Sequence, residues 1–154
     1  MALANNFRTW RTRVMFNLFP CFRRTGARIT SISPDEQTVK LKIPLNWTTR
    51  GYFGTTFGGS IYGATDPVLM VMLNRLLGRG YVVWDKAAHV EFKKPGRSTL
   101  FATFHISDEE LAGLRQELEA TPRLDRTYTV DLVDAAGTVH ATVEKVLHFR
   151  KRST

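Results

Sequence analysis

The sequence has few of the features that mark several large classes of protein. It contains a single cysteine, Cys21, which excludes an internal disulfide framework and fits a reducing compartment. No hydrophobic run is long enough to span a membrane, and no low-complexity tract or short-period repeat occurs. The four histidines are scattered without ligand spacing, so we expect no metal and no cofactor. Without an assignable partner, Cys21 is expected to be a small core residue.

Acidic residues are also absent from the first 34 positions, although arginine is common there. The first acid, Asp35, follows six arginines, and the whole chain carries a net charge of +8. A solvated basic surface is the simplest explanation, and an anionic ligand, a membrane surface or nucleic acid are the alternatives. A nucleic-acid partner is not expected, because the aromatic and basic pattern of an RNA-binding surface is not evident. Contact with a membrane is not expected either.

Apolar residues at helical spacing predict an amphipathic helix at about residues 5–19. The stripe consists of Phe7, Trp10, Val14, Leu18 and Phe22. An arginine-rich start without acids also fits a transit peptide or an interfacial helix. We expect an ordinary helix that packs this stripe onto its own domain and is ended by Pro20.

The remaining patterns predict one α+β domain over residues 1–154. Alternating apolar and polar residues indicate strands at 28–33, 37–43, 81–94, 99–106, 127–133 and 138–149. Ser107 followed by Glu110 is a capping box and predicts a short helix after it. Because helix-rich and strand-rich stretches are segregated, a mostly antiparallel sheet is favoured.

One segment, from Phe57 to about Leu77, is apolar on nearly every side and predicts a buried helix. Asp66 is its only charged residue before Arg75, and a buried carboxylate is costly unless it is paired, hydrogen-bonded or protonated. Gly58 and Gly59 lie at the expected helix start, where backbone N–H groups lack partners. An acid and free amide donors on one helix are what a hydrolytic site requires.

Four short motifs carry a resemblance to a known family. They are Gly54-Thr55-Thr56-Phe57-Gly58-Gly59-Ser60, Thr65-Asp66-Pro67, Val83-Trp84-Asp85-Lys86-Ala87 and Phe92-Lys93-Lys94-Pro95-Gly96. Over about residues 14–152 the chain resembles a hotdog-fold thioesterase-like family of largely unassigned function, related to phenylacetate-pathway-type acyl-CoA thioesterases. The resemblance implies a curved, mostly antiparallel sheet wrapped around one long buried helix. It further implies a homodimer or dimer of dimers with its site at the subunit interface. Because the single cysteine fits a reducing compartment, we expect a cytoplasmic protein.

The same resemblance implies roles for particular residues. Asp66 would be the nucleophile or the general base, and the amides of Gly58 and Gly59 would bind the thioester oxygen as negative charge develops. The implied substrate-binding residues are Thr55, Thr56, Phe57, Tyr62, Lys93, Lys94 and Arg97, the basic ones near coenzyme A phosphates. A structural role for Asp66, accepting hydrogen bonds from Thr65, Tyr62 or a neighbouring strand, stays open.

The expected function is therefore hydrolysis of an acyl-CoA or acyl-carrier thioester. The alternative is a non-catalytic protein that binds acyl-CoA or a fatty acyl chain, since Phe57 stands where active relatives often carry histidine. Gly59 and Gly63 also fit close packing against a partner helix. Two charged pairs, Asp85-Lys86 and Glu144-Lys145, lie in apolar strands, and we expect them to pair between strands or subunits.

Overall fold

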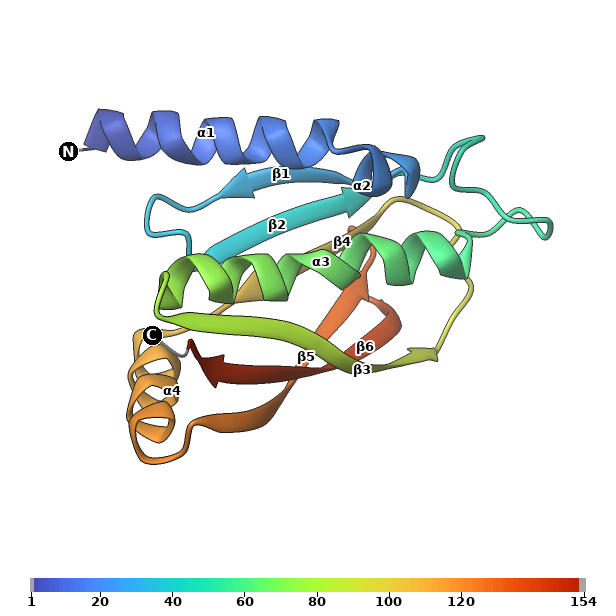
Figure 1. Cartoon of the computed structure of the whole chain (residues 1–154). Coiled ribbons are helices and arrows are strands. Elements are labelled where there is room, and N and C mark those ends of the chain that lie inside the picture. The colour runs from blue at the N-terminus through green and yellow to red at the C-terminus, as the bar shows by residue number, and fades with distance from the viewer. Residues whose placement is uncertain (1, 153–154) are drawn as a thin grey trace.

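The computed structural model describes residues 2–152, with side chains from residue 7 onward. A curved sheet of six antiparallel strands, in the order β1-β2-β4-β5-β6-β3, holds a long helix against one face (Figure 1). The strands are β1 (Arg28–Ile32), β2 (Thr38–Ile43), β3 (Tyr81–Phe92), β4 (Leu100–His105), β5 (Arg123–Val133) and β6 (Val139–Lys151). The helices are α1 (Ala2–Leu18), α2 (Pro20–Arg24), α3 (Gly58–Leu77) and α4 (Asp108–Ala120). The predicted α+β architecture is confirmed.

Helix α3 is the apolar segment expected to be buried, and it runs without interruption through Pro67. Ile61, Val68 and Leu73 are among its buried residues and belong to the same core as the inner strands. Gly78 ends the helix with a φ of 86°, a conformation that glycine adopts without strain. The side of α3 that faces away from the sheet is only partly covered within one chain. A partner subunit has space to cover it.

Strand β3 forms one edge of the sheet and, within residues 2–152, pairs with β6 alone. The register shifts between Asp85 and Ala87, which places a bulge at Lys86. Residues 87–89 are exposed one after another, although a half-buried strand would alternate. The outer edge of β3 is therefore open to a further strand, whereas the other edge strand, β1, lies against α1 (Figure 1).

Helix α1 does not present the face that its sequence suggested. Phe7, Trp10 and Leu18 are 59%, 50% and 61% exposed, and only Phe22, in α2, is buried as expected. The helix instead contacts β1 through polar side chains: Asn17 exchanges two hydrogen bonds with the backbone of Ile29, at 3.0 and 2.8 Å. The expectation that this stripe packs inward is wrong, because these specific bonds fix the opposite orientation.

Two further expectations differ from the structure. Cys21 is exposed rather than in the core. Strand β5 begins at Arg123 rather than at residue 127. The polar residues at its start are held in the strand by surface ion pairs. Arg126 contacts Glu110 at 2.9 Å and also Glu117 of α4, so these charged residues are compatible with a strand.

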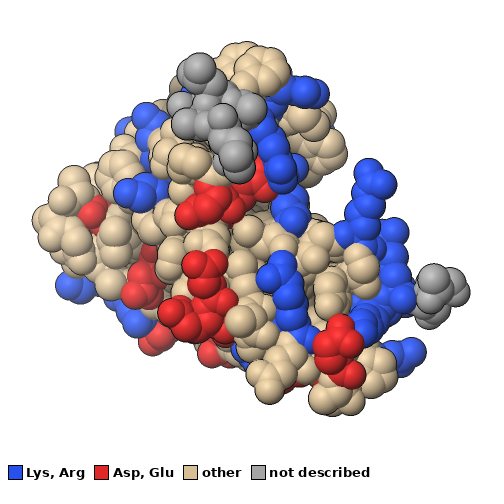
Figure 2. Space-filling model, turned by 90° about the vertical axis from the view of Figure 1, so that its left-hand side faces the viewer, with Lys and Arg blue, Asp and Glu red and all other residues tan. Residues whose placement is uncertain are grey.

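Charged side chains are unevenly distributed over the molecule. On the face shown in Figure 2, acidic side chains occupy the middle and lower parts, while the top shows basic and uncharged ones. Within residues 2–152, no helix is long and apolar enough to cross a membrane.

Candidate active site

A buried lysine joins two carboxylates where α3, β3 and β6 meet. The Nζ atom of Lys145, on β6, lies 2.7 Å from Oδ1 of Asp66 on α3 and 2.7 Å from Oδ1 of Asp85 on β3. The Lys145 side chain is 0% exposed, whereas that of Asp66 is 42% exposed. The bond to Asp66 is a directed hydrogen bond, while the contact with Asp85 is an ion pair without that alignment. Asp66 is thus held from one side and remains accessible from the other.

The protonation of this cluster follows from burial and charge. Burial alone would lower the pKa of Lys145, but its hydrogen bond to Asp66 and its attraction to both carboxylates outweigh burial and raise it. Burial raises the pKa of Asp85, since the pairing with Lys145 compensates only in part. Asp85 is the more buried of the two acids, with its side chain 25% exposed against 42% for Asp66, so the expectation of a fully buried Asp66 is wrong.

Tyr62 completes the cluster one turn before Asp66 on α3. Its ring centre lies 5.4 Å from Nζ of Lys145, within the range of a cation–π contact. Burial, and next the Asp66 carboxylate, raise the pKa of the Tyr62 phenol, so the hydroxyl keeps its proton at neutral pH. Tyr62 and Asp66 are four residues apart, which is why they share one face of the helix.

The structure answers the question of what pairs with Asp66. The hydroxyl of Thr65 donates to the carbonyls of Ile61 and Tyr62 rather than to Asp66. The partner is Lys145, 79 positions away in the sequence. Lys145 interrupts the apolar inner face formed by Val143 and Leu147, and a lone lysine on such a face requires a buried anion. That interruption was the signal that could have identified the pair.

The glycine pair begins α3 as predicted. The amides of Gly58 and Gly59 have no acceptor among residues 2–152, whereas those of Ser60 and Ile61 bond to the Phe57 carbonyl at 3.0 and 3.2 Å. A Cβ on Gly58 would lie 2.9 Å from the ring of Phe92, and one on Gly59 would lie 2.3 Å from the ring of Phe57. Two exposed phenyl rings therefore lie close to the helix start, and each would have to move to admit a Cβ there.

Gly63 approaches Thr25 of the same chain, since an added Cβ would lie 3.0 Å from the Thr25 methyl. This intrachain contact gives Gly63 a packing role within its own chain, different from the partner helix expected for it.

A groove of about 410 Å³ opens beside the glycine pair. Its lining includes Thr55, Thr56, Gly58, Phe92, Lys93 and Lys94. The two lysines follow the end of β3, and Lys93 lies 3.6 Å from Glu91. Arg97 does not line this groove. Phe57, which is 59% exposed, covers the neighbouring Gly59.

The structure thus divides the predicted site residues into two groups on one helix. Asp66 and Tyr62 lie with Lys145, while Gly58 and the threonines lie at the groove. Eight residues separate Gly58 from Asp66, and at about 1.5 Å per residue this is about 12 Å along the axis. One thioester carbonyl cannot contact both groups within a single chain.

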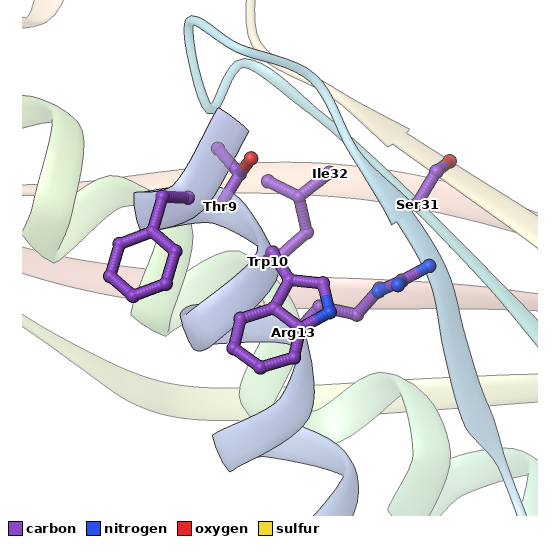
Figure 3. Close-up of a pocket in the computed structure, with 6 residues that line it drawn as sticks. Thr9, Trp10, Arg13, Ser31 and Ile32 are labelled. Atoms are coloured by element: carbon purple, nitrogen blue, oxygen red, sulfur yellow. The ribbon is translucent and has the colours of Figure 1, made fainter. Parts of the chain in front are cut away.

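Another cavity, of about 490 Å³, lies between α1 and β1 (Figure 3). Trp10 and Arg13 reach it from the helix, and Ser31 and Ile32 reach it from the strand. It shares no lining residue with the Asp66 cluster or with the groove at Gly58. Across residues 2–152, no group of three His, Cys, Asp or Glu side chains could hold a metal ion.

Solved structures define the class of this fold. A protein of Pseudomonas aeruginosa described as a probable thioesterase superposes with a TM-score of 0.82 at 16% identity, over 93% of this chain and 95% of the other. A thioesterase of Haemophilus influenzae gives 0.68 at 12% identity, over 93% and 90%. The PaaI protein from the phenylacetic acid degradation operon of E. coli gives 0.63 at 16% identity, over 100% and 99%. The chain has the hotdog fold, as the motifs implied.

The sequence profile of the family described as "Domain of unknown function (DUF4442)" matches residues 8–148. The chain belongs to this family. No curated protein matches the sequence.

Proposed function

We propose that the protein hydrolyses an acyl thioester at a site shared by two copies of the chain. The observation that carries the proposal is the pair of open amides and the half-exposed carboxylate of α3, about 12 Å apart on the helix. A second copy pairing along the open edge of β3 would run antiparallel to the first. Asp66 of one copy could then lie beside Gly58 of the other.

The chemistry assigns one task to each group. Asp66 accepts a proton from water as the water oxygen attacks the thioester carbon. In the alternative, the Asp66 carboxylate attacks that carbon itself, and after the thiolate has left a water molecule hydrolyses the acyl–aspartate anhydride and restores Asp66. Negative charge develops on the carbonyl oxygen, where the amides of Gly58 and Gly59 stabilise it. The carbon–sulfur bond then breaks, and the thiolate leaves and takes up a proton. Lys145 orients Asp66 and balances its charge.

The substrate class follows from the groove. Thr55 and Thr56 supply hydroxyls, Phe92 supplies an apolar wall, and Lys93 and Lys94 supply positive charge at its rim. This combination suits a thioester that carries phosphates, such as an acyl-CoA or an acyl group on a phosphopantetheine carrier. Tyr62 is proposed to contact the acyl group beside Asp66, and Arg97 to contribute charge beyond the groove.

The direct test is release of free thiol from short, long and aromatic acyl-CoA esters. Asp66→Asn keeps the shape of the side chain and is expected to lower kcat by about 10²–10⁴-fold. Asp131→Asn is the matched control, since Asp131 is an exposed aspartate on β5 outside the site. The proposal would be overturned if Asp66→Asn released thiol as fast as the wild-type protein from every ester that the wild type hydrolyses.

A second variant removes an amide at a helix position that accepts proline, although the exposed ring of Phe92 has to move to admit the added side chain. Gly58 is the first residue of α3, where proline is favoured, and Phe57 has φ −65° and ψ 130°, which is compatible with a following proline. Gly58→Pro deletes one N–H donor and is expected to cost about 10²–10³-fold in kcat.

Two observations favour a second candidate, a protein that binds an acyl-CoA without cleaving it. Phe57 covers Gly59, at the position where the resemblance implies a histidine in active relatives, and Lys145 already occupies one oxygen of Asp66. This candidate predicts CoA-ester binding by calorimetry with no thiol release and no effect of Asp66→Asn on affinity.

A further inference from the structure

The side of α1 that faces away from the sheet is apolar. A helix that packs on a sheet usually turns its apolar side toward the sheet and its polar side toward solvent. Phe7, Met15 and Leu18 lie on this side at helical spacing and are 59%, 66% and 61% exposed. Phe19 follows the helix and is 63% exposed. Single exposed apolar residues are ordinary, but a row of them along one helix marks an interaction surface. We call these four residues the apolar face of α1.

The orientation of α1 is fixed by contacts on its other side. Arg13 donates a hydrogen bond of 2.9 Å to the carbonyl of Thr30, and Asn17 bonds to both backbone groups of Ile29. Phe16 packs edge-to-face against the buried Phe22, with ring centres 4.8 Å apart. Turning the apolar face inward would break all of these contacts. The folded structure therefore keeps this face exposed.

The apolar face continues into a groove between α1, α2 and α3. This groove has a volume of about 260 Å³, and Met15 and Phe19 form one wall while Pro67 and Val71 of α3 form the other. The uncovered apolar surface is therefore continuous over three helices.

Positive charge surrounds the apolar face. Arg11 lies over the ring of Phe7, with its guanidinium carbon 5.9 Å from the ring centre. Arg23 and Arg24 of α2 are exposed, and no acidic residue occurs before Asp35. In Figure 2 the acidic side chains likewise stay away from the top of the molecule.

We propose that the apolar face of α1 docks the protein onto an anionic lipid surface. Apolar side chains along a helix enter the boundary between headgroups and acyl chains, and arginines beside them meet the lipid phosphates. A second copy of the chain fits less well, because it would bring arginine against arginine. This departs from the expectation of no membrane contact, which rested on an inward-facing stripe, and it does not depend on the proposed hydrolysis.

The test uses the full chain in flotation with vesicles of phosphatidylcholine alone or with added phosphatidylglycerol. Binding is expected only to the anionic vesicles and is expected to weaken as salt is raised. Met15→Ser with Leu18→Ser should weaken it about tenfold or more, because both side chains lose their apolar contact. The matched control is Trp47→Ser with Phe53→Ser, which changes two residues that are 90% and 84% exposed on the loop between β2 and α3.

The charge contribution is tested separately. Arg23→Ala with Arg24→Ala should weaken binding about thirtyfold, since each basic residue near an anionic surface contributes about fivefold. The control is Arg79→Ala with Arg123→Ala, which removes equal charge from exposed positions elsewhere. Circular dichroism checks that each variant is folded.

Three results would overturn the proposal. The first is no binding, or equal binding to neutral vesicles. The second is unchanged binding by the variant of Met15 and Leu18. The third is a change of sedimentation coefficient in that variant, which would show that a second copy covers the face.

Discussion

Lys145 is the residue on which the arrangement of the candidate site depends. Its ammonium is fully buried and lies 2.7 Å from a carboxylate oxygen of Asp66 and of Asp85. Removing one partner of a buried ion pair costs far more than the pair contributes, because the remaining charge keeps its desolvation penalty. Here, loss of the lysine would leave two carboxylates facing each other.

We therefore predict that Lys145→Met lowers the free energy of unfolding by about 3 kcal/mol. Lys86→Met is the matched control: Lys86 is 57% exposed and pairs with Asp125 at the surface, so its loss should cost less than about 1 kcal/mol. Urea denaturation of the two variants measures the difference. Equal effects would mean that the Lys145 cluster does not contribute as a buried network.

At the scale of elements, α4 shows how a local signal fixes a boundary. Ser107 precedes the helix, and its hydroxyl accepts a hydrogen bond of 3.1 Å from the Glu110 amide, as the capping pattern predicted. Ser107→Ala should lower the free energy of unfolding by about 1 kcal/mol, because one helix-start amide loses its acceptor. Ser98→Ala, at an exposed loop serine, should leave it unchanged within error in the same denaturation experiment.

The turn between β1 and β2 is tied to two helices by Glu36. Its carboxylate lies 2.6 Å from Arg75 of α3 and 3.2 Å from Arg8 of α1, although its φ of 64° is unusual for a residue other than glycine. Burial would raise the pKa of Glu36, but the hydrogen bond and charge of Arg75, and next Arg8, lower it below its ordinary 4.5.

This lowered pKa gives a pH prediction. A carboxylate whose folded pKa is depressed contributes stability that is present above its unfolded pKa and is lost as the pH falls through the folded value. Glu36→Gln should therefore lower stability by about 2 kcal/mol at neutral pH and reduce the loss of stability below about pH 4.5. Thermal unfolding between neutral and acid pH measures this, with the exposed Glu91→Gln as control. Parallel pH profiles of wild type and Glu36→Gln would contradict it.

Element positions could largely be predicted from the sequence, whereas orientations could not. Alternation and turn residues marked the strands, and apolar density marked α3. The sequence did not predict which side of α1 faces the sheet, because its stripe of Phe7, Trp10 and Leu18 resembles the side of a helix that packs into a core. Only the hydrogen bonds of Asn17 and Arg13 to β1 decide which side faces the sheet.

The candidate site was predictable in part for the same reason. Asp66 and the glycine pair stood out because a charge and two glycines are rare in an apolar helix. The pairing of Asp66 with Lys145 depends on the approach of α3 and β6, which no local pattern encodes. Burial of Asp85 at the bulge of β3 is likewise a property of the assembled sheet.

At the scale of the whole molecule, the open edge of β3 predicts assembly. If two β3 strands pair edge to edge, a two-fold axis relates them, and a residue near this axis lies opposite the same residue of the other copy. Ala88→Glu on β3 would then bring two negative charges together across the axis. We predict that this variant dissociates the oligomer in sedimentation velocity, whereas Thr103→Glu on β4, a strand paired on both sides, does not. A protein that is monomeric before any substitution would contradict subunit pairing.

The most direct test of the account is complementation between two inactive variants. Asp66→Asn and Gly58→Pro chains are purified separately, assayed for thiol release, then unfolded together and refolded as a mixture. In a mixed dimer, one site keeps Asp66 from the Gly58→Pro chain and the Gly58 amide from the Asp66→Asn chain. A shared site predicts that the mixture regains activity that neither variant has alone. No recovery in a mixture shown to contain mixed dimers would contradict a site built from Asp66 of one copy and Gly58 of the other.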